Sequence, residues 1–153
     1  MVTVAKPLVA EPLFVDTNVL IYANIVRAPF HEQALNALKL AHRSERPLWI
    51  SRQVLREVIV ILTRPQTFAQ PSTPNVVIER IRYLEERFQV ADDTAAVTRR
   101  LIELLRDYRV GGKQIHDANI VATMLAYDIP CLLTHNEKDF DRFGKIIKIE
   151  TIG

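Results

Sequence analysis

The sequence predicts a single α/β domain, in which a parallel sheet of about five strands is covered by helices on both faces. Short apolar runs alternate along the chain with longer amphipathic runs, which is the order expected of strand–helix repeats. The short runs are almost continuously apolar, as is typical of strands buried on both faces of a parallel sheet. A chain of 153 residues, 48% of them apolar and 25% charged, can form one domain with its own core and is not a disordered chain.

The first half of the chain is expected to form two strands and three helices. In chain order these are a strand at 13–15, helices at 18–25 and 30–43, a strand at 48–50 and a helix at 52–63. Pro29 separates the first two helices, because proline interrupts a helix. The hydroxyl of Ser51 can cap the third helix, and Pro65 stops it.

The second half is expected to form three helices and three strands. In chain order these are a loop at 64–73, a helix from 74, a strand at 88–90, helices at 93–108 and 115–127, and strands at 131–133 and 146–149. Pro74 lies at the favoured first position of its helix. Asp92 and Asp93 are expected to cap the helix that follows them.

The N-terminal segment and the cysteine content bear on where the domain begins and where it works. The first twelve residues contain Lys6, Glu11 and two prolines, so they resemble neither a signal-peptide core nor a membrane span of ~20 apolar residues. We expect a loose extension at 1–11, one domain at 12–153 and no membrane association. Cys131 is the single cysteine and cannot form an internal disulfide, which favours a reducing cytoplasm. The net charge of +2 permits nucleic-acid binding without demonstrating it.

Polar side chains follow the first and fourth predicted strands. Asp16 follows the first, Thr134 and Asn136 follow the fourth, and Asp139 comes three residues after Asn136. Ligands of open parallel sheets bind beyond the carboxyl ends of the strands, so these side chains are expected at one site. The alternative is purely structural, with Asp16 capping the next helix and Asp139 capping a short turn.

Two further acids lie on the apolar faces of predicted helices. At about 100° per residue, Glu57 shares its side with Val54 and Ile61, and Asp117 shares its side with Val121. A carboxylate in such a stripe costs several kcal/mol unless a partner compensates for the lost water, and these faces carry no Lys or Arg. Glu57 could instead reach solvent along its stem, and Asp117 could be favoured by the helix dipole. The conjunction of several acids at one end of one sheet favours a divalent cation.

The donor types indicate which metal and which chemistry. Oxygen-only ligands select Mg²⁺ or Mn²⁺, as one or two ions. The chain has no paired cysteines and no His-x-x-x-His spacing, so zinc is disfavoured, and His116 and His135 are expected to be surface or supporting groups. Such a site suits phosphodiester hydrolysis, because one metal lowers the pKa of a bound water and a second can stabilise the leaving oxygen.

Four segments of the chain match a known set of motifs in order. They are Phe14-Val15-Asp16-Thr17-Asn18-Val19-Leu20, Ser51-Arg52-Gln53-Val54-Leu55-Arg56-Glu57, Gly112-Lys113-Gln114-Ile115-His116-Asp117-Ala118-Asn119-Ile120-Val121-Ala122 and Thr134-His135-Asn136-Glu137-Lys138-Asp139-Phe140. Together they resemble the motifs of PIN-domain nucleases, most closely those of VapC-type toxins of toxin–antitoxin pairs. The resemblance covers the chain from Leu13 to Ile149. It implies a PIN fold, Mg²⁺ or Mn²⁺, endonucleolytic cleavage of RNA, a homodimer and inhibition by an antitoxin protein from the neighbouring gene.

By this match Asp16, Glu57 and Asp117 would be catalytic metal ligands. The fourth motif departs from the family pattern, because some members carry an acid where this chain has Asn136. Asn136 could ligate through its carbonyl oxygen or through water, with Asp139 as the fourth catalytic acid and supplier of charge. The small polar groups that orient the acids or the attacking water in the family correspond to Thr17, Asn18 and Thr134.

Basic residues near these motifs are candidates for holding the RNA backbone, with solvated surface charge as the alternative. They are Arg52, Arg56, Lys113 and Lys138. The sequence has no base-reading motif and no RNA-binding aromatic pattern. Three other functions are weighed: a PIN nuclease in RNA processing, a catalytically silent PIN-like binding module and a receiver-type signalling domain. The receiver requires an acidic pair after the first strand, where Asp16 is followed by Thr17 and Asn18.

Overall fold

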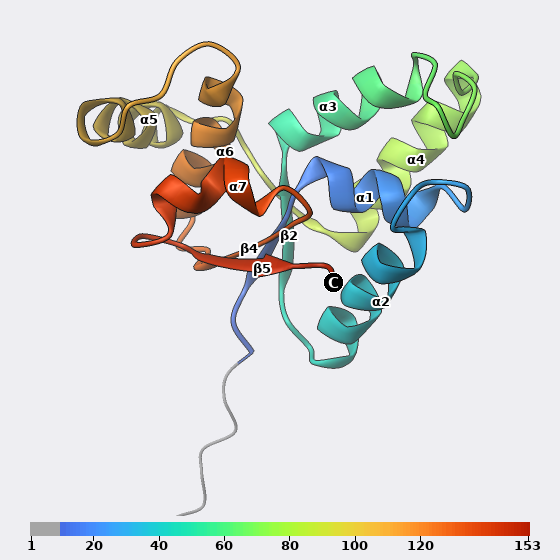
Figure 1. Ribbon diagram of the computed structural model, residues 1–153, viewed down its shortest axis with the longest axis horizontal. Coiled ribbons are helices and arrows are strands. Elements are labelled where there is room, and N and C mark those ends of the chain that lie inside the picture. Colours follow the sequence, from blue (N-terminus) through green and yellow to red (C-terminus); the bar gives the residue numbers. More distant parts are fainter. Residues whose placement is uncertain (1–9) are drawn as a thin grey trace, which may run out of the picture.

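The computed structural model describes residues 10–153 and contains one five-stranded sheet, which Figure 1 shows between two groups of helices. All four strand pairings are parallel, and the strands lie in the order β3-β2-β1-β4-β5. The strands are β1 (Leu13–Val15), β2 (Leu48–Ser51), β3 (Gln89–Ala91), β4 (Cys131–Thr134) and β5 (Lys148–Thr151). The predicted fold class is therefore confirmed.

The central strand of the sheet is β1, and all residues of β1 and of its neighbour β4 are buried. Leu13 lies opposite both Leu48 of β2 and Cys131 of β4, so the three strands end at nearly the same level. The Asp16 backbone N–H extends the pairing, donating to the Leu133 carbonyl over 3.0 Å. This register carries Asp16 and Thr134 to the same edge of the sheet.

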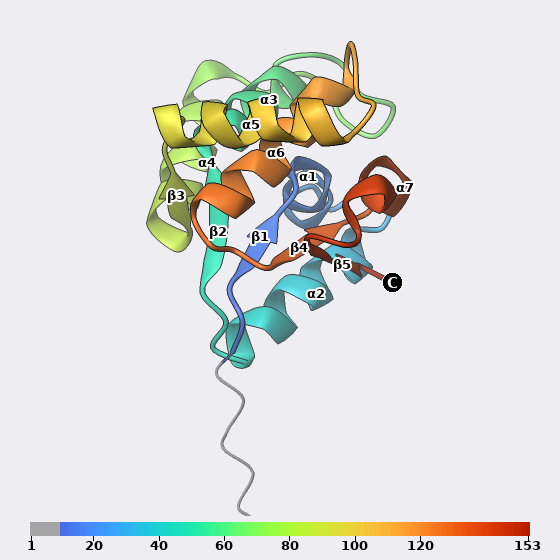
Figure 2. The same cartoon turned by 90° about the vertical axis from the view of Figure 1, so that its left-hand side faces the viewer.

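Helices cover both faces, as expected from the alternation of apolar and amphipathic runs. They are α1 (Thr17–Asn24), α2 (His31–Arg43), α3 (Arg52–Leu62), α4 (Pro74–Arg87), α5 (Ala95–Asp107), α6 (Gln114–Ala126), α7 (Glu137–Phe140) and the 3-10 helix η1 (Asp141–Phe143). In Figure 1, α1, α2 and α4 lie to one side of the strands and α5 and α6 to the other. Figure 2 shows α5 and α6 together on the face turned to the viewer. The bounds of α1, α2, α3, α5 and α6 agree with the sequence to within two residues.

The end of the chain differs from the expectation. The last strand begins at Lys148 rather than at residue 146, and two short helices, α7 and η1, precede it. The Ile146 and Ile147 N–H groups both donate to the Phe143 carbonyl, so these apolar residues close a turn instead of starting a strand. β5 is an edge strand with exposed ends, and its polar residues hide it from a search for apolar runs.

The predicted capping role of Asp92 and Asp93 is wrong. The Thr94 hydroxyl caps α5 by accepting from the Val97 N–H. Asp92 and Asp93 instead form ion pairs with Arg52 and Arg56 of α3, at 3.1 and 3.4 Å. The cause is the strand order, because β3 lies next to β2 and therefore brings the residues after β3 beside the start of α3.

The boundary drawn after residue 11 falls partly outside the described residues, since 1–9 are not described. Glu11 itself contacts the amino edge of the sheet, accepting from Lys148 Nζ at 2.7 Å and from Cys131 Sγ at 3.2 Å. The Arg46 guanidinium donates to the Glu11 carbonyl and to both carboxylate oxygens of Glu150. These contacts join the segment before β1 to β4 and β5. No helix within residues 10–153 is long and apolar enough to cross a membrane.

Candidate active site

A pocket of about 480 Å³ opens at the carboxyl edge of the sheet, and we call it the acidic pocket. It collects side chains from the ends of β1 and β4 and from α1, α3, α6 and α7. The residues that line it are Asp16, Thr17, Asn18, Gln53, Arg56, Glu57, Val60, Ile61, Arg64, His116, Asp117, Asn136 and Asp139. All five predicted ligands thus face one cavity, although they come from four separate parts of the chain.

Asp16 is the most buried acid of the acidic pocket, with only 7% of its surface exposed. One carboxylate oxygen accepts from the Thr17 N–H and so caps α1, and the other accepts from the Thr134 hydroxyl, both over 2.8 Å. The capping role and a role in the site are therefore compatible. Burial raises the pKa of Asp16 to about 7, and the charges of Glu57 and Asp117 act in the same direction.

Glu57 is held by two polar neighbours rather than by a cation. One carboxylate oxygen accepts from the Thr17 hydroxyl at 2.6 Å, and the other accepts from the Gln53 amide at 3.1 Å. Gln53 also donates to the His116 carbonyl and accepts from the Asn119 side chain, each over 2.8 Å. Gln53 therefore links α3 to α6 and fixes the Glu57 carboxylate.

Gln53 is a residue of the acidic pocket that the sequence analysis did not predict. It lies one turn before Glu57 on the same side of the helix, and it is buried to 6% exposure. A buried glutamine requires partners for its amide, so its position in an apolar stripe was the available signal. Arg64, Val60 and Ile61 were also not predicted, because only the course of α3 along the cavity brings them to it.

Asp117, in the first turn of α6, and Asp139, on α7, line the same pocket and lie close enough for the charge of Asp139 to act on Asp117. The pKa of Asp117 is raised to about 6, chiefly by burial and then by the charges of Asp139 and Glu57, in that order. The charge acting on Asp117 from α7 is therefore that of Asp139, whereas Asn136 contributes a neutral amide. Both Asn136 and Asp139 line the acidic pocket.

The turn after β4 is tied to Asp16 through Thr134, which is completely buried. The Thr134 hydroxyl donates to Asp16 and accepts from the Asn136 N–H at 3.0 Å. Asn18 supports the same turn, because its side-chain oxygen accepts from the His135 N–H at 3.3 Å. The three predicted supporting residues, Thr17, Asn18 and Thr134, thus each contact an acid of the site or the turn that carries Asn136 and Asp139.

The chemistry of this donor set fits a hard divalent cation. None of the ion pairs within residues 10–153 uses Asp16, Glu57, Asp117 or Asp139. In the same range, no group of three or more His, Cys, Asp or Glu side chains already lies close enough together to hold a metal ion. Carboxylates that share a cavity repel one another, so they would converge only around a cation. Oxygen ligands of this kind match Mg²⁺ or Mn²⁺.

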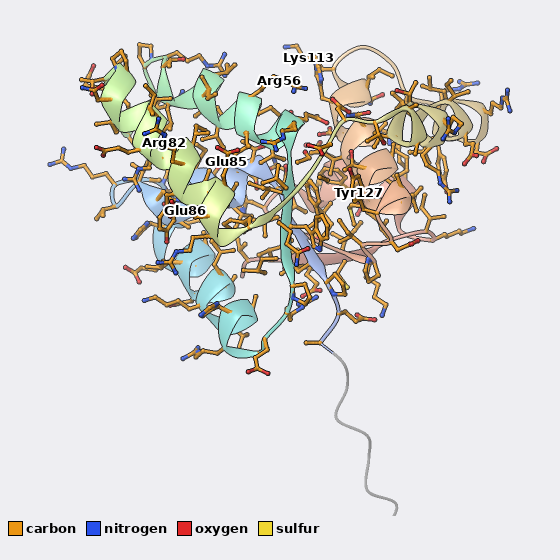
Figure 3. All side chains as sticks on the ribbon, turned by 180° about the vertical axis from the view of Figure 1, so that it is seen from behind. Arg56, Arg82, Glu85, Glu86, Lys113 and Tyr127 are labelled. Atoms are coloured by element: carbon orange, nitrogen blue, oxygen red, sulfur yellow. The ribbon has the colours of Figure 1, made fainter. Side chains whose placement is uncertain are left out.

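The predicted basic residues do not all lie at the acidic pocket. Arg56 lines it, and Figure 3 shows Arg56 on α3 and Lys113 before α6 at the same upper edge of the molecule. Arg52 points elsewhere, since its guanidinium pairs with Glu85 at 2.9 Å and with Asp92. Lys113 and Lys138 are exposed and do not line the cavity. Arg64 does line it and is the second arginine of the rim.

Comparisons with known proteins agree with the motifs. A family model described as PIN domain matches residues 13–146. No curated protein matches the chain. Among solved structures, the chain is similar to VapBC2 from Rickettsia felis bound to a promoter DNA fragment, with a TM-score of 0.66 and 22% identity over 92% of this chain and 98% of that one.

Two other solved structures give the same result. One is DNA-bound VapBC from Salmonella typhimurium, with a TM-score of 0.64 and 23% identity over 94% of this chain and 99% of that one. The other is VapC20 from Mycobacterium tuberculosis, a toxin that cleaves the sarcin–ricin loop, with a TM-score of 0.58 and 20% identity over 78% and 86% of the two chains. The similarity to VapC-type structures is thus confirmed for the fold, and a receiver-type domain has no support. With its acids gathered at the carboxyl edge of a β3-β2-β1-β4-β5 sheet and its family match over residues 13–146, the chain belongs to the PIN domain family.

Proposed function

We propose that the chain is a divalent-metal-dependent endoribonuclease and the toxin of a toxin–antitoxin pair. The observation that carries the proposal is the acidic pocket, where four carboxylates from α1's cap, α3, α6 and α7 share one cavity and form no ion pair within residues 10–153. Such an arrangement is unfavourable for stability on its own and becomes favourable when a cation is bound.

In this proposal the cation is Mg²⁺ or Mn²⁺, held by Asp16, Glu57, Asp117 and Asp139, with the Asn136 carbonyl oxygen as a further ligand. When bound, it would polarise the phosphodiester and make water a better nucleophile near neutral pH. Every other contribution comes from the chain itself.

The polar neighbours hold two of the acids in place, since Thr17 donates to Glu57 and Thr134 donates to Asp16. The hydrogen bond from Thr134 favours the charged form of Asp16 and so partly opposes the rise in the pKa of Asp16 that burial causes. Gln53 prevents Glu57 from rotating toward solvent. Arg56 and Arg64 line the rim of the cavity, where their guanidinium groups suit backbone phosphates on either side of the cleaved bond.

The assignment of RNA, an antitoxin partner and a homodimer rests on the family and on its relatives. VapC20 is a toxin that cleaves the sarcin–ricin loop, and a similar structure from Klebsiella pneumoniae is a toxin–antitoxin complex. A cytoplasmic location is proposed with them. A short reading frame abutting the gene, whose product binds this chain and inhibits it, would distinguish a toxin from a PIN nuclease of RNA processing.

The experiment that tests the function is cleavage of a mixed structured RNA by the purified protein in Mg²⁺, Mn²⁺ or EDTA. Asp117→Asn is the test variant, and Glu103→Gln is the control because Glu103 is an exposed acid on α5. We expect metal-dependent cleavage that Glu103→Gln keeps and Asp117→Asn loses. A folded wild-type protein that neither binds metal nor cleaves would instead be a catalytically silent binding module.

A further inference from the structure

Three aromatic rings gather beside the turn that follows β4. The Phe30 and His135 rings pack against each other in a tilted arrangement, with ring centroids 4.1 Å apart and planes inclined by 37°. Tyr22 of α1 contacts both rings, with centroid distances of 5.8 Å to Phe30 and 5.5 Å to His135. Phe30 as a residue remains 43% exposed, so it is not simply part of the core.

The backbone of Phe30 is in an unfavourable conformation. Its φ of 60° and ψ of 18° lie in the left-handed region, which bulky residues rarely adopt. The loop is also fastened independently of the ring, because His31 Nδ1 donates to the Tyr22 carbonyl over 2.7 Å. Strained backbone conformations of this kind are concentrated at active sites and ligand-binding sites.

A second pocket, of about 250 Å³, opens on this ring pair, and we call it the aromatic pocket. Phe30 and His135 line it together with the polar side chains of Gln33, Glu137 and Thr151. Figure 1 shows the end of the chain beside α2, and Gly153 lies against Gln33 and closes this side of the pocket. The volume is below the ~300–1,000 Å³ of pockets for larger ligands, so it suits a single planar group.

The aromatic pocket adjoins the acidic pocket through consecutive residues. His135 lines the first and Asn136 lines the second. Asn18, which faces the acidic pocket, also binds the His135 N–H and so holds the two walls together. A group bound on Phe30 and His135 is therefore a near neighbour of a phosphodiester held at the carboxylates.

We propose that the aromatic pocket is a nucleobase subsite, where one unpaired base of the RNA, adjacent to the cleaved phosphate, stacks on Phe30 and His135. The inference rests on the proposed function for its ligand. Unpaired bases are recognised by stacking on aromatic rings, with polar groups reading the base edge. Gln33, Glu137 and Thr151 are positioned to supply donors and acceptors for that edge.

The test uses short single-stranded RNAs that carry 2-aminopurine at each position in turn, because the fluorescence of this base is quenched when it stacks. Binding is measured with the full chain in the Asp117→Asn background and Mg²⁺, and a gel checks that the RNA stays intact. We expect quenching at one position. Phe30→Gly should abolish it and weaken binding by about fivefold to 150-fold, the range for loss of one stacking ring.

Controls separate the ring from the loop that carries it. Glycine tolerates a positive φ, so Phe30→Gly removes the ring while it relaxes the backbone. The midpoint temperature of thermal unfolding of this variant should therefore be unchanged or raised. Phe30→Tyr should restore quenching. Tyr83→Ala, which removes an exposed ring on α4, should leave it unchanged.

Several results would overturn the inference. The first is that 2-aminopurine is quenched at no position of the RNA. The second is that the folded protein does not bind RNA. The third is that quenching persists in folded Phe30→Gly. A changed oligomeric mass in Phe30→Gly with unchanged quenching would make this face a contact between copies. RNA cleavage by the chain with Asp117 intact is measured separately. Metal-dependent cleavage without any quenching would contradict only the nucleobase subsite. Quenching without metal-dependent cleavage would contradict only the proposed nuclease activity.

Discussion

Replacing Asp117 by asparagine should make the metal-free protein more stable while abolishing its activity. The pKa of Asp117 rises from 3.8 to about 6 on folding. At 1.36 kcal/mol per unit, a fully buried carboxylate would lower the free energy of unfolding by about 3 kcal/mol near neutral pH. Asp117 is half-buried, so solvent screening reduces this to about 1–2 kcal/mol.

The sign of the effect follows from proton binding. Between the unfolded pKa of 3.8 and the folded pKa of about 6, the native state holds more protons than the unfolded state. The penalty is therefore complete above pH 6, about half as large at pH 5, and absent below pH 4. Asp117→Asn removes the charge at little cost, because the Asp117 side chain accepts no hydrogen bond among those within the described residues.

The assay is urea unfolding followed by circular dichroism in EDTA at pH 7.5 and pH 5, for wild type, Asp117→Asn and Glu103→Gln. We expect Asp117→Asn to gain about 1–2 kcal/mol at pH 7.5, or about 2–8 °C in Tm, and roughly half of that at pH 5. Glu103→Gln should change little at either pH. A destabilised Asp117→Asn at pH 7.5, or a gain that does not depend on pH, would refute the account of Asp117 as a repelled carboxylate.

Three other predictions follow from the same site. Mg²⁺ at 100 times its Kd should stabilise wild type by about 2.7 kcal/mol and Asp117→Asn much less; equal shifts in thermal unfolding would place the metal elsewhere. Metal affinity in a titration should fall as the pH drops below about 7, because Asp16 (pKa about 7) and then Asp117 take up protons that compete with the cation. A metal affinity that stays the same between pH 8 and pH 5.5 would contradict this. Thr134→Val should lower the free energy of unfolding in urea by about 1–3 kcal/mol, because it leaves Asp16 Oδ2 without its donor, whereas Thr134→Ser keeps the hydroxyl and should cost less; equal losses would show that the methyl group matters as much as the hydroxyl.

The acidic pocket could be predicted because its main residues are recognisable from their neighbours in the sequence. Asp16 directly follows an apolar run, and Glu57 and Asp117 interrupt apolar helix faces. Each signal needs only the period of its own element and the rule that parallel strands end together. Gln53 gave a weaker signal of the same type, since an amide can reach solvent as well as bridge two helices.

The sequence by itself determined the parallel α/β class, most element bounds and the end of the sheet at which the acids meet, because hydrophobic period and strand direction act over a few residues. Only the tertiary structure decided which distant groups become neighbours. The order β3-β2-β1-β4-β5 sets Asp92 beside Arg52 and removes that arginine from the acidic pocket. The left-handed backbone before α2 turns Phe30 onto His135, a pairing that no local rule favours. Such contacts depend on packing between segments far apart in the chain, and the aromatic pocket therefore became visible only in the folded molecule.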